Sequence, residues 1–225
     1  MSDEPSTSSA SPISANARRV LGVLVEKAKT TPDSYPLTVA AIITGSNQKS
    51  NRSPKMELDE TDALNALDEL RAAGAAREIQ GSGRATKYRH AMYGWMGIEA
   101  AESAIMTELL LRGPQTVGEL RTRASRMHPF DDLDVVRETL EMLETKNLVH
   151  PLTPAGRGQV FAHRLYQPTE AQHVAARVEK LGDASAAPKS TASENRVAVD
   201  ELLKRLESVN QRIDDLEKRI ADLES

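Results

Sequence analysis

One local pattern occurs twice in this sequence of 225 residues, and it constrains the fold more than any other feature. Residues 67–90 and residues 140–166 each contain the end of a helix with an apolar face, a helix stop, and two short strand-like segments around a glycine-containing turn. Gly74 stops the helix of the first copy and Asn147 that of the second, because both residue types tolerate the left-handed backbone of a helix end. The repeat indicates that one supersecondary unit is used twice.

Each copy is expected to contain three helices followed by a two-stranded wing. Ser14, Asp59 and Thr116 are the expected helix caps. Apolar spacing predicts helices at 15–29, 38–44 and 60–73, then at 99–112, 116–126 and 132–146. Strands are expected at 75–80, 84–91, 148–152 and 159–166. We therefore predict a mainly α fold with small β wings, made of two tandem winged helix-turn-helix domains at 14–95 and 96–167.

Two expectations concern packing. Leu64, Leu67 and Leu70 are predicted to face inward from the third helix, since they recur at helical spacing. The segment 92–98, which contains Trp95, is predicted to pack between the two domains. Winged-helix units of this size are not expected to contain a deep pocket.

The remaining segments flank this block. Residues 1–13 are predicted to be a disordered head, and 168–196 a short helix followed by a flexible linker whose low-complexity part is 182–195. Residues 197–225 are predicted to form a parallel, homodimeric coiled coil, because apolar residues keep a strict heptad spacing, β-branched at most a positions and mostly leucine at d. The heptad residues are Val199, Leu202, Leu206, Val209, Ile213, Leu216, Ile220 and Leu223.

Composition excludes several function classes. The chain has no cysteine, which rules out thiol catalysis, disulfides and zinc–thiolate sites. No apolar run is long enough for a membrane span, and the polar, acidic start does not resemble a signal peptide. The histidines lack metal-ligand spacing and no nucleophile motif occurs. We expect a cytoplasmic protein that is not an enzyme and holds no metal or cofactor.

Basic clusters on the predicted turns and wings are the candidate nucleic-acid-binding residues, because these parts of a winged helix approach phosphates. They are Lys49, Arg52, Lys55, Arg84, Lys87, Arg89, Arg121, Arg123, Arg126 and Arg157. The predicted third helices, however, are rich in carboxylates, which phosphates would repel. Solvated surface, intramolecular ion pairing and contact with a protein partner therefore stay open as alternatives.

Four motifs give the chain a resemblance to a known family. LGVLVEK (21–27), TTPDSYPLT (30–38), NQKSNR (47–52) and LLLRGPQTVGELRTRASRM (109–127) occur in the order seen in the YceH-like family of bacterial proteins, which the chain resembles over about residues 15–166. The resemblance implies tandem winged helices, often followed by a coiled coil, and a cytoplasmic location. It implies no activity and no catalytic residue.

Two functions remain as hypotheses. The first is a non-enzymatic, dimeric, nucleic-acid-associated protein, such as a transcriptional regulator. The second is a protein–protein adaptor that uses its winged helices as docking surfaces. Segregation of the candidate cations on one face would favour the first hypothesis, and carboxylates interleaved with them would favour the second.

Overall fold

The computed structural model describes residues 10–80, 85–156 and 158–186. The chain divides into two compact units, Met1–Leu181 and Gly182–Ser225, and the elements described here belong to the first unit apart from the last turn of one helix. Residues 1–9 of the predicted head and all of the predicted coiled coil at 197–225 lie outside the described residues. The heptad repeat therefore stays a prediction. The prediction of a head up to residue 13 is wrong at its end, because Ile13 is buried in the core and its N–H donates to Leu165 O at 3.2 Å.

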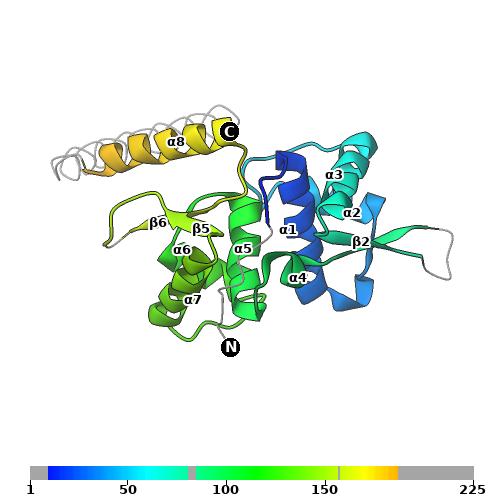
Figure 1. Cartoon of the computed structure of the whole chain (residues 1–225), viewed down its shortest axis with the longest axis horizontal. Coiled ribbons are helices and arrows are strands. Elements are labelled where there is room, and N and C mark those ends of the chain that lie inside the picture. Colours follow the sequence, from blue (N-terminus) through cyan, green and yellow to red (C-terminus); the bar gives the residue numbers. More distant parts are fainter. Residues whose placement is uncertain (1–9, 81–84, 157, 187–225) are drawn as a thin grey trace, which may run out of the picture. The chain divides into compact units, whose positions relative to one another are not determined.

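The first half of the compact unit is mainly helical, with one small sheet (Figure 1). Its helices are α1 (Ala15–Thr30), the short 3-10 turn η1 (Pro32–Ser34), α2 (Val39–Ser46) and α3 (Glu60–Ala72). Its strands are β1 (Leu37–Thr38), β2 (Ala76–Ile79) and β3 (Lys87–His90), antiparallel in the order β1-β3-β2. The Ser14 and Asp59 side chains accept hydrogen bonds from the first turns of α1 and α3, as predicted.

The second half repeats this order of elements. Its helices are α5 (Ala100–Arg112), α6 (Val117–Ala124) and α7 (Leu133–Thr145). Its strands are β4 (Gln115–Thr116), β5 (Val149–Pro151) and β6 (Val160–His163), antiparallel in the order β4-β6-β5. Helix α4 (Met92–Met96) connects the halves, and α8 (Pro168–Ala186) follows the second sheet. The predicted capping box of Thr116 and Glu119 is present at α6.

Three further predictions need correction. Each sheet has a third strand, β1 or β4, that was not predicted. A strand of two residues is too short to show an alternating sequence pattern. Leu64 is 39% exposed, because Ala63, Ala66, Leu67 and Leu70 form the buried stripe of α3 and Leu64 lies about 100° away from its centre. The low-complexity segment predicted as linker from residue 182 overlaps the last turn of α8, which continues to Ala186.

Helices α1 and α5 lie side by side at the centre and are buried on all sides (Figure 1). Every residue from Ala17 to Glu26 and from Glu102 to Leu111 is buried. The helices approach closely at Gly22, where an added Cβ would lie 2.8 Å from Leu111 Cδ2. One hydrophobic core therefore continues from one half into the other.

Candidate nucleic-acid interface

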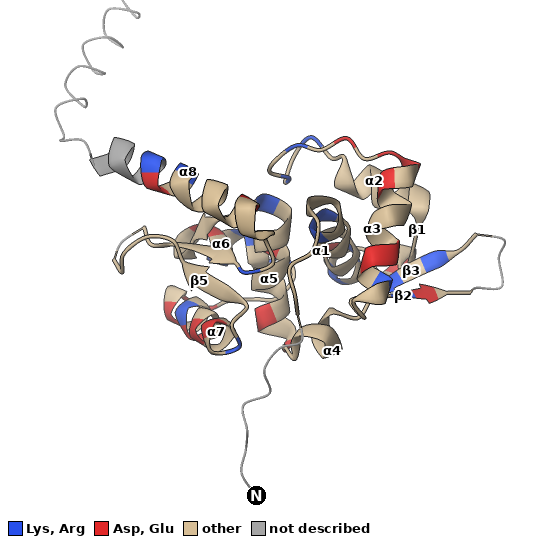
Figure 2. Ribbon diagram, turned by 45° about the horizontal axis from the view of Figure 1, so that its top comes forward, with Lys and Arg blue, Asp and Glu red and all other residues tan. Residues whose placement is uncertain are grey.

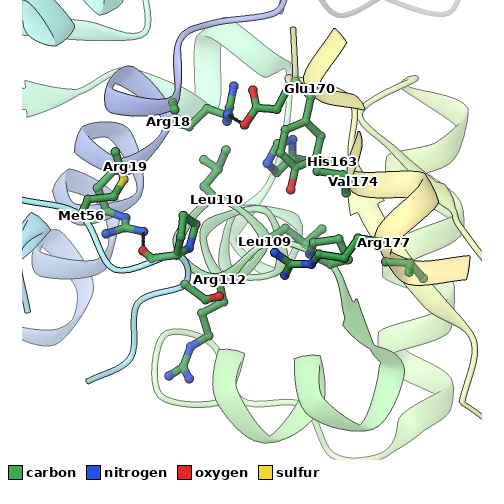
Figure 3. A pocket seen from close by; sticks show the side chains of 17 residues that line it. Arg18, Arg19, Met56, Leu109, Leu110, Arg112, His163, Glu170, Val174 and Arg177 are labelled. Atoms are coloured by element: carbon green, nitrogen blue, oxygen red, sulfur yellow. Dashed lines mark hydrogen bonds and ion pairs between the residues drawn. The ribbon is translucent and has the colours of Figure 1, made fainter. Parts of the chain in front are cut away.

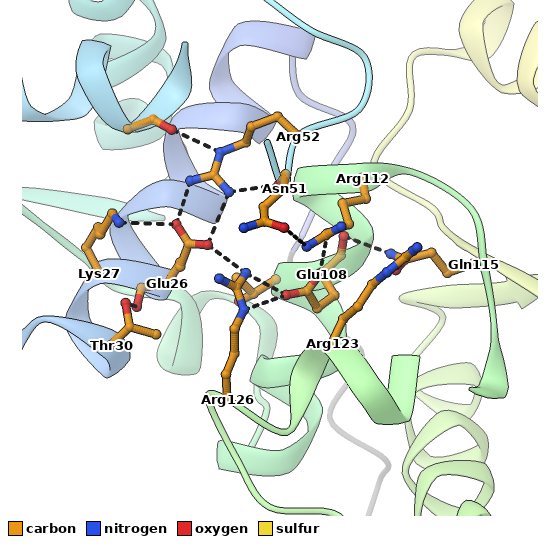
Figure 4. Close-up of polar contacts among 12 residues, drawn as sticks. Glu26, Lys27, Thr30, Asn51, Arg52, Glu108, Arg112, Gln115, Arg123 and Arg126 are labelled. Carbon is orange, nitrogen blue, oxygen red and sulfur yellow. Dashed lines mark hydrogen bonds and ion pairs between the residues drawn. The ribbon is translucent and has the colours of Figure 1, made fainter. Parts of the chain in front are cut away.

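Two of the predicted phosphate-binding arginines lie instead in a buried ion-pair cluster (Figure 4). Arg52 donates hydrogen bonds to both carboxylate oxygens of Glu26, at 3.1 and 2.6 Å, and its side chain is 0% exposed. Arg126 Nη2 lies 2.6 Å from Glu26 Oε1 and 2.7 Å from Glu108 Oε1. The Arg52 guanidinium has no face left for a phosphate, and Arg126 is occupied by two carboxylates.

The cluster joins α1 to α5, since Glu26 belongs to the first helix and Glu108 to the second. Glu108 also lies 3.0 Å from Arg112 Nε, and Arg112 donates to Asn51 Oδ1 at 2.7 Å. Burial raises the pKa of Glu26, but the hydrogen bonds and charges of Arg52, together with the charge of Arg126, outweigh burial and leave the pKa below its ordinary value. Both carboxylates are buried and compensated by arginines, and Arg126 reaches them from the protein surface, where its side chain is 33% exposed.

Sequence reasoning missed this cluster, although a signal was present. Glu26 directly follows a run of apolar residues and Glu108 interrupts one, and both lie in the buried part of their helices. A carboxylate in such a place requires a cationic partner. The partners come from distant parts of the chain, so helical periodicity could not identify them.

The described cations of the second copy are also engaged within the chain. Arg123 lies 3.0 Å from Glu119 and donates to Gln115 at 2.7 Å. Arg121 donates to the backbone carbonyls of Phe130 and Asp131, which holds the loop between α6 and α7. Of the remaining candidates, Arg84 and Arg157 lie outside the described residues.

The wing of the first copy presents cations that are not engaged in this way. In the β2–β3 register Arg77 lies directly opposite Arg89, and Lys87 lies two residues before Arg89 on β3. Because side chains alternate along a strand, Arg77, Lys87 and Arg89 share one face of the hairpin, and all three are exposed. The opposite face carries buried Ala76 and Tyr88. Figure 2 shows the basic segments of β3 along this wing.

Within the described residues, no ion pair involves Arg77, Lys87 or Arg89. Like charges directly opposite each other on neighbouring strands destabilise a sheet, so the Arg77–Arg89 pair has an unfavourable electrostatic energy unless an anion lies over it. Arg77 was not among the predicted site residues. Its alternation with the buried Ala76 and its position opposite Arg89 could have indicated it, had the strand register been known.

The remaining two candidates, Lys49 and Lys55, are exposed in the loop between α2 and α3. Asn47 closes this loop, since its side chain donates to Leu58 O and accepts from Leu58 N, both at 2.8 Å. The strand register does not bring these lysines into the wing face. They are exposed cations on a closed loop.

Part of the acidity of α3 is directed into the protein. Glu69 accepts hydrogen bonds from the backbone N–H and the hydroxyl of Ser14, and Asp62 accepts one from Asn16 at 3.2 Å. On the outer side, Asp68 is paired with Arg71 at 3.0 Å. The third helix of the first copy is therefore less repulsive to a polyanion than its composition suggests.

Helix α7 of the second copy differs in this respect. Its exposed side carries Asp134, Glu138 and Glu141 together with the apolar side chains of Leu133 and Met142, which is 49% exposed. Figure 2 shows the acidic colouring of this helix. The wing of the first copy and helix α7 of the second copy therefore present chemically different surfaces, one cationic and one acidic with exposed apolar side chains.

The described residues contain neither a metal-binding cluster nor a membrane-spanning helix. No group of three or more histidine, aspartate or glutamate side chains in the described ranges could hold a metal ion. No helix in the same ranges is long and apolar enough to cross a bilayer.

Comparison with known proteins finds relatives across both copies. The profile of a family described as "Protein of unknown function, DUF480" matches residues 13–158. A UPF0502 protein of Rhodopirellula baltica is 64% identical over 190 residues, which cover 84% of this chain and 80% of that relative. UPF0502 proteins of Geobacter metallireducens and Delftia acidovorans are 45% and 41% identical, over 84% and 73% of this chain and over 84% and 76% of their own lengths.

Proposed function

Because this chain belongs to the DUF480 family of UPF0502 proteins, whose description names no activity, we propose a function from its geometry. The protein is a non-enzymatic nucleic-acid-associated protein, such as a transcriptional regulator, and it contacts phosphates through the outer face of its first wing. The observation that carries this proposal is the alignment of Arg77, Lys87 and Arg89 on one exposed strand face without carboxylate partners in the described part of the chain.

The physical argument is electrostatic. Three cations on a short hairpin repel one another, and a phosphate backbone over that face would replace the repulsion with attraction while releasing counterions. A wing is also the part of a winged helix that approaches the backbone of a duplex. Such contacts position the protein on the duplex but carry little sequence information.

The wider interpretation rests on the sequence. The resemblance to the YceH-like family supports tandem winged-helix domains divided near residues 95 and 96, and the repeated element order agrees with it. The heptads at 199–223 support a parallel homodimer, which would present two cationic wings to one duplex. Equilibrium sedimentation of the full chain tests this part, and a monomer at micromolar concentration would contradict it.

A titration of labelled duplex at two salt concentrations tests the wing. We expect the triple variant Arg77→Gln, Lys87→Gln, Arg89→Gln to bind more weakly, and the slope of log affinity against log salt to fall by about 1 for each phosphate contact removed. The single variant Lys87→Gln should also bind the duplex more weakly than the wild type. Its matched control is Lys180→Gln, at an exposed lysine on α8, and this variant should bind as the wild type does. Absence of duplex binding at low salt, or equal binding by the triple variant, would contradict the proposal.

One observation favours the adaptor hypothesis as a second candidate. The exposed side of α7 combines acidic side chains with Leu133 and Met142, and apolar side chains within a charged rim are typical of protein interaction surfaces. A pull-down from native lysate with and without nuclease separates the two functions. Partners that survive nuclease treatment and are lost with Met142→Glu would support the adaptor, whereas partners lost on nuclease treatment would support the nucleic-acid function.

A further inference from the structure

A pocket of about 200 Å³ lies among α1, α5, the loop at residues 53–56 and α8 (Figure 3). Met56, Leu109, Leu110 and Val174 contribute apolar side chains to it. Local sequence patterns could not predict this pocket, because its walls come from both copies of the repeat and from the helix that follows them. Its volume is below the roughly 300–1,000 Å³ of pockets that hold drug-sized ligands, so any occupant must be small.

The charges on the pocket wall are unequal. Arg18, Arg19, Arg112 and Arg177 line the pocket, and the only lining carboxylate is that of Glu170. Glu170 is paired with Arg18, and Arg112 is paired with Glu108 in the buried cluster. Arg19 and Arg177 take part in no ion pair among the described residues, so the wall keeps an excess of positive charge.

Arg19 is the most unusual of these residues. It is only 2% exposed, and its guanidinium donates to two backbone carbonyls, Ser46 O at 2.9 Å and Pro54 O at 2.6 Å. Its Nε has no hydrogen-bond partner. Burial, together with the charge of Arg52, lowers the pKa of Arg19 to about 10, so the side chain is still cationic at neutral pH.

A buried cation without a counterion is unfavourable unless an anion reaches it. The guanidinium of Arg19 has five N–H donors, and the two carbonyl bonds leave some of them unused. Arg177 is exposed on α8 at the same pocket, where it adds positive potential without being part of the core (Figure 3). The buried, unpaired Arg19 is therefore the observation that points to an anionic ligand, and Arg177 increases the positive potential at the same pocket.

The other polar groups of the wall are neutral. His163 Nδ1 accepts a hydrogen bond from Leu165 N–H at 3.2 Å, which places the imidazole proton on Nε2. Complete burial, with the charge of Arg18 nearby, holds the pKa of His163 well below its ordinary value, so the ring is neutral. The Tyr166 ring stacks on His163 with 3.9 Å between ring centroids. These groups provide a flat wall that does not repel an anion.

We propose that this pocket binds a small organic monocarboxylate, with its carboxylate at Arg19 within the field of Arg177 and its apolar body against Leu110, Met56 and Val174. The apolar lining favours a carboxylate with a hydrocarbon body over a bare inorganic anion. The planar guanidinium suits a carboxylate. This proposal is independent of the proposed nucleic-acid function, and it would make the protein responsive to a metabolite acid.

A matched panel of small ligands tests the proposal on the full chain. The panel contains linear monocarboxylic acids of increasing length, benzoate and phenylacetate, each beside its neutral amide, together with inorganic phosphate. Binding is measured by calorimetry and by ligand-observed NMR. We expect at least one acid to bind, its amide to bind at least tenfold more weakly, and phosphate to bind more weakly than the acid.

Two variants locate the site. Arg177→Gln removes an exposed cation of the pocket and should weaken acid binding about tenfold, whereas Lys180→Gln on the same helix should leave it unchanged. Arg19→Gln should abolish binding, and its circular dichroism reports whether it has folded. The proposal is overturned if no acid of the panel binds, if acids and amides bind equally, if phosphate alone binds, or if Arg177→Gln and Lys180→Gln behave alike.

Discussion

At the scale of single residues, the carboxylates of Glu26 and Glu108 are buried charges inside the central helices α1 and α5. Each is enclosed in a helix that is buried all round, and each is tolerated only because arginines from other elements reach it. Replacing a whole buried ion pair by apolar side chains is often neutral, but removing one partner leaves a charge without compensation. Removing a single member of this cluster should therefore cost more stability than replacing a whole ion pair by apolar side chains.

The substitution Glu26→Gln should lower the free energy of unfolding by about 3–5 kcal/mol, because it leaves the buried Arg52 without a counterion and leaves Arg126 with Glu108 alone. Asp134→Asn is the matched control, since Asp134 is paired with Arg137 on the exposed side of α7 and should contribute no more than about 0.5 kcal/mol. Urea denaturation followed by circular dichroism measures both. Equal losses in the two variants would show that the cluster does not stabilise the fold.

His90 should make stability fall in mild acid. Burial, with the charges of Lys29 and Arg89, lowers the pKa of His90 from 6.5 to about 4, so between these values the unfolded chain binds a proton that the folded chain does not. The free energy of unfolding should therefore decrease as pH falls from 6.5 to 4, by up to about 3 kcal/mol from this residue.

The variant His90→Phe tests this, because it keeps an aromatic ring beside Tyr35 and Tyr93 and removes both ring nitrogens, of which Nδ1 has no hydrogen-bond partner. Urea midpoints measured from pH 7 to pH 5 should depend less on pH in this variant than in the wild type. His173→Gln, at an exposed position on α8, should retain the wild-type dependence. An unchanged slope in His90→Phe would exclude the residue as the cause.

At the scale of elements, the sequence predicted most helices and strands to within a few residues, since caps and apolar spacing are local signals. Ser14, Asp59 and the Thr116–Glu119 box all act as predicted. The elements that were not predicted depend on contacts between elements. Strands β1 and β4, for example, exist only because β3 and β6 pair with them. The cationic wing face was found only in part for the same reason, because Arg77 joins it through the register with Arg89.

Helix α2 gives a test of how closely elements approach one another. The predicted helix ended at Thr44, whereas α2 continues through Gly45 to Ser46. An added Cβ at Gly45 would lie 2.7 Å from Val23 Cγ1, in the buried part of α1. The glycine is thus required by the neighbouring helix rather than by a turn.

The variant Gly45→Ala should therefore lose about 1–2 kcal/mol of stability, because the clash exceeds the gain in helix propensity. Gly118→Ala in the corresponding helix α6 should gain about 0.5–1 kcal/mol, since no atom lies within 4 Å of its added Cβ. Thermal and urea denaturation measure both changes. Stabilisation of both variants would mean that α1 and α2 are farther apart than described.

At the scale of the whole molecule, the repeat was visible in the sequence but the way the two copies combine was not. The first helix of each copy has apolar residues on more than one side, and a single helix cannot reveal which neighbour covers each side. In the structure α1 and α5 cover each other, and the core continues through both. The buried cluster and the small pocket were also unpredictable, because both need residues from the two copies at once.

The first copy should consequently fail to fold by itself. A fragment of residues 10–98 would expose the side of α1 that α5 covers and would remove Arg126 from Glu26. We expect it to lack a cooperative thermal transition and dispersed amide resonances, whereas a fragment of residues 10–181 should show both. A cooperative transition in the shorter fragment would show that the copies are independent domains.

Arg126 has a consequence for how any large partner is engaged. Since this one side chain lies between a carboxylate of α1 and a carboxylate of α5, the two sheets are held as parts of one body before anything binds. A duplex or protein long enough to touch both sheets would therefore meet contact points whose separation is already fixed. Such a protein would discriminate partners by their dimensions at least as much as by their chemistry.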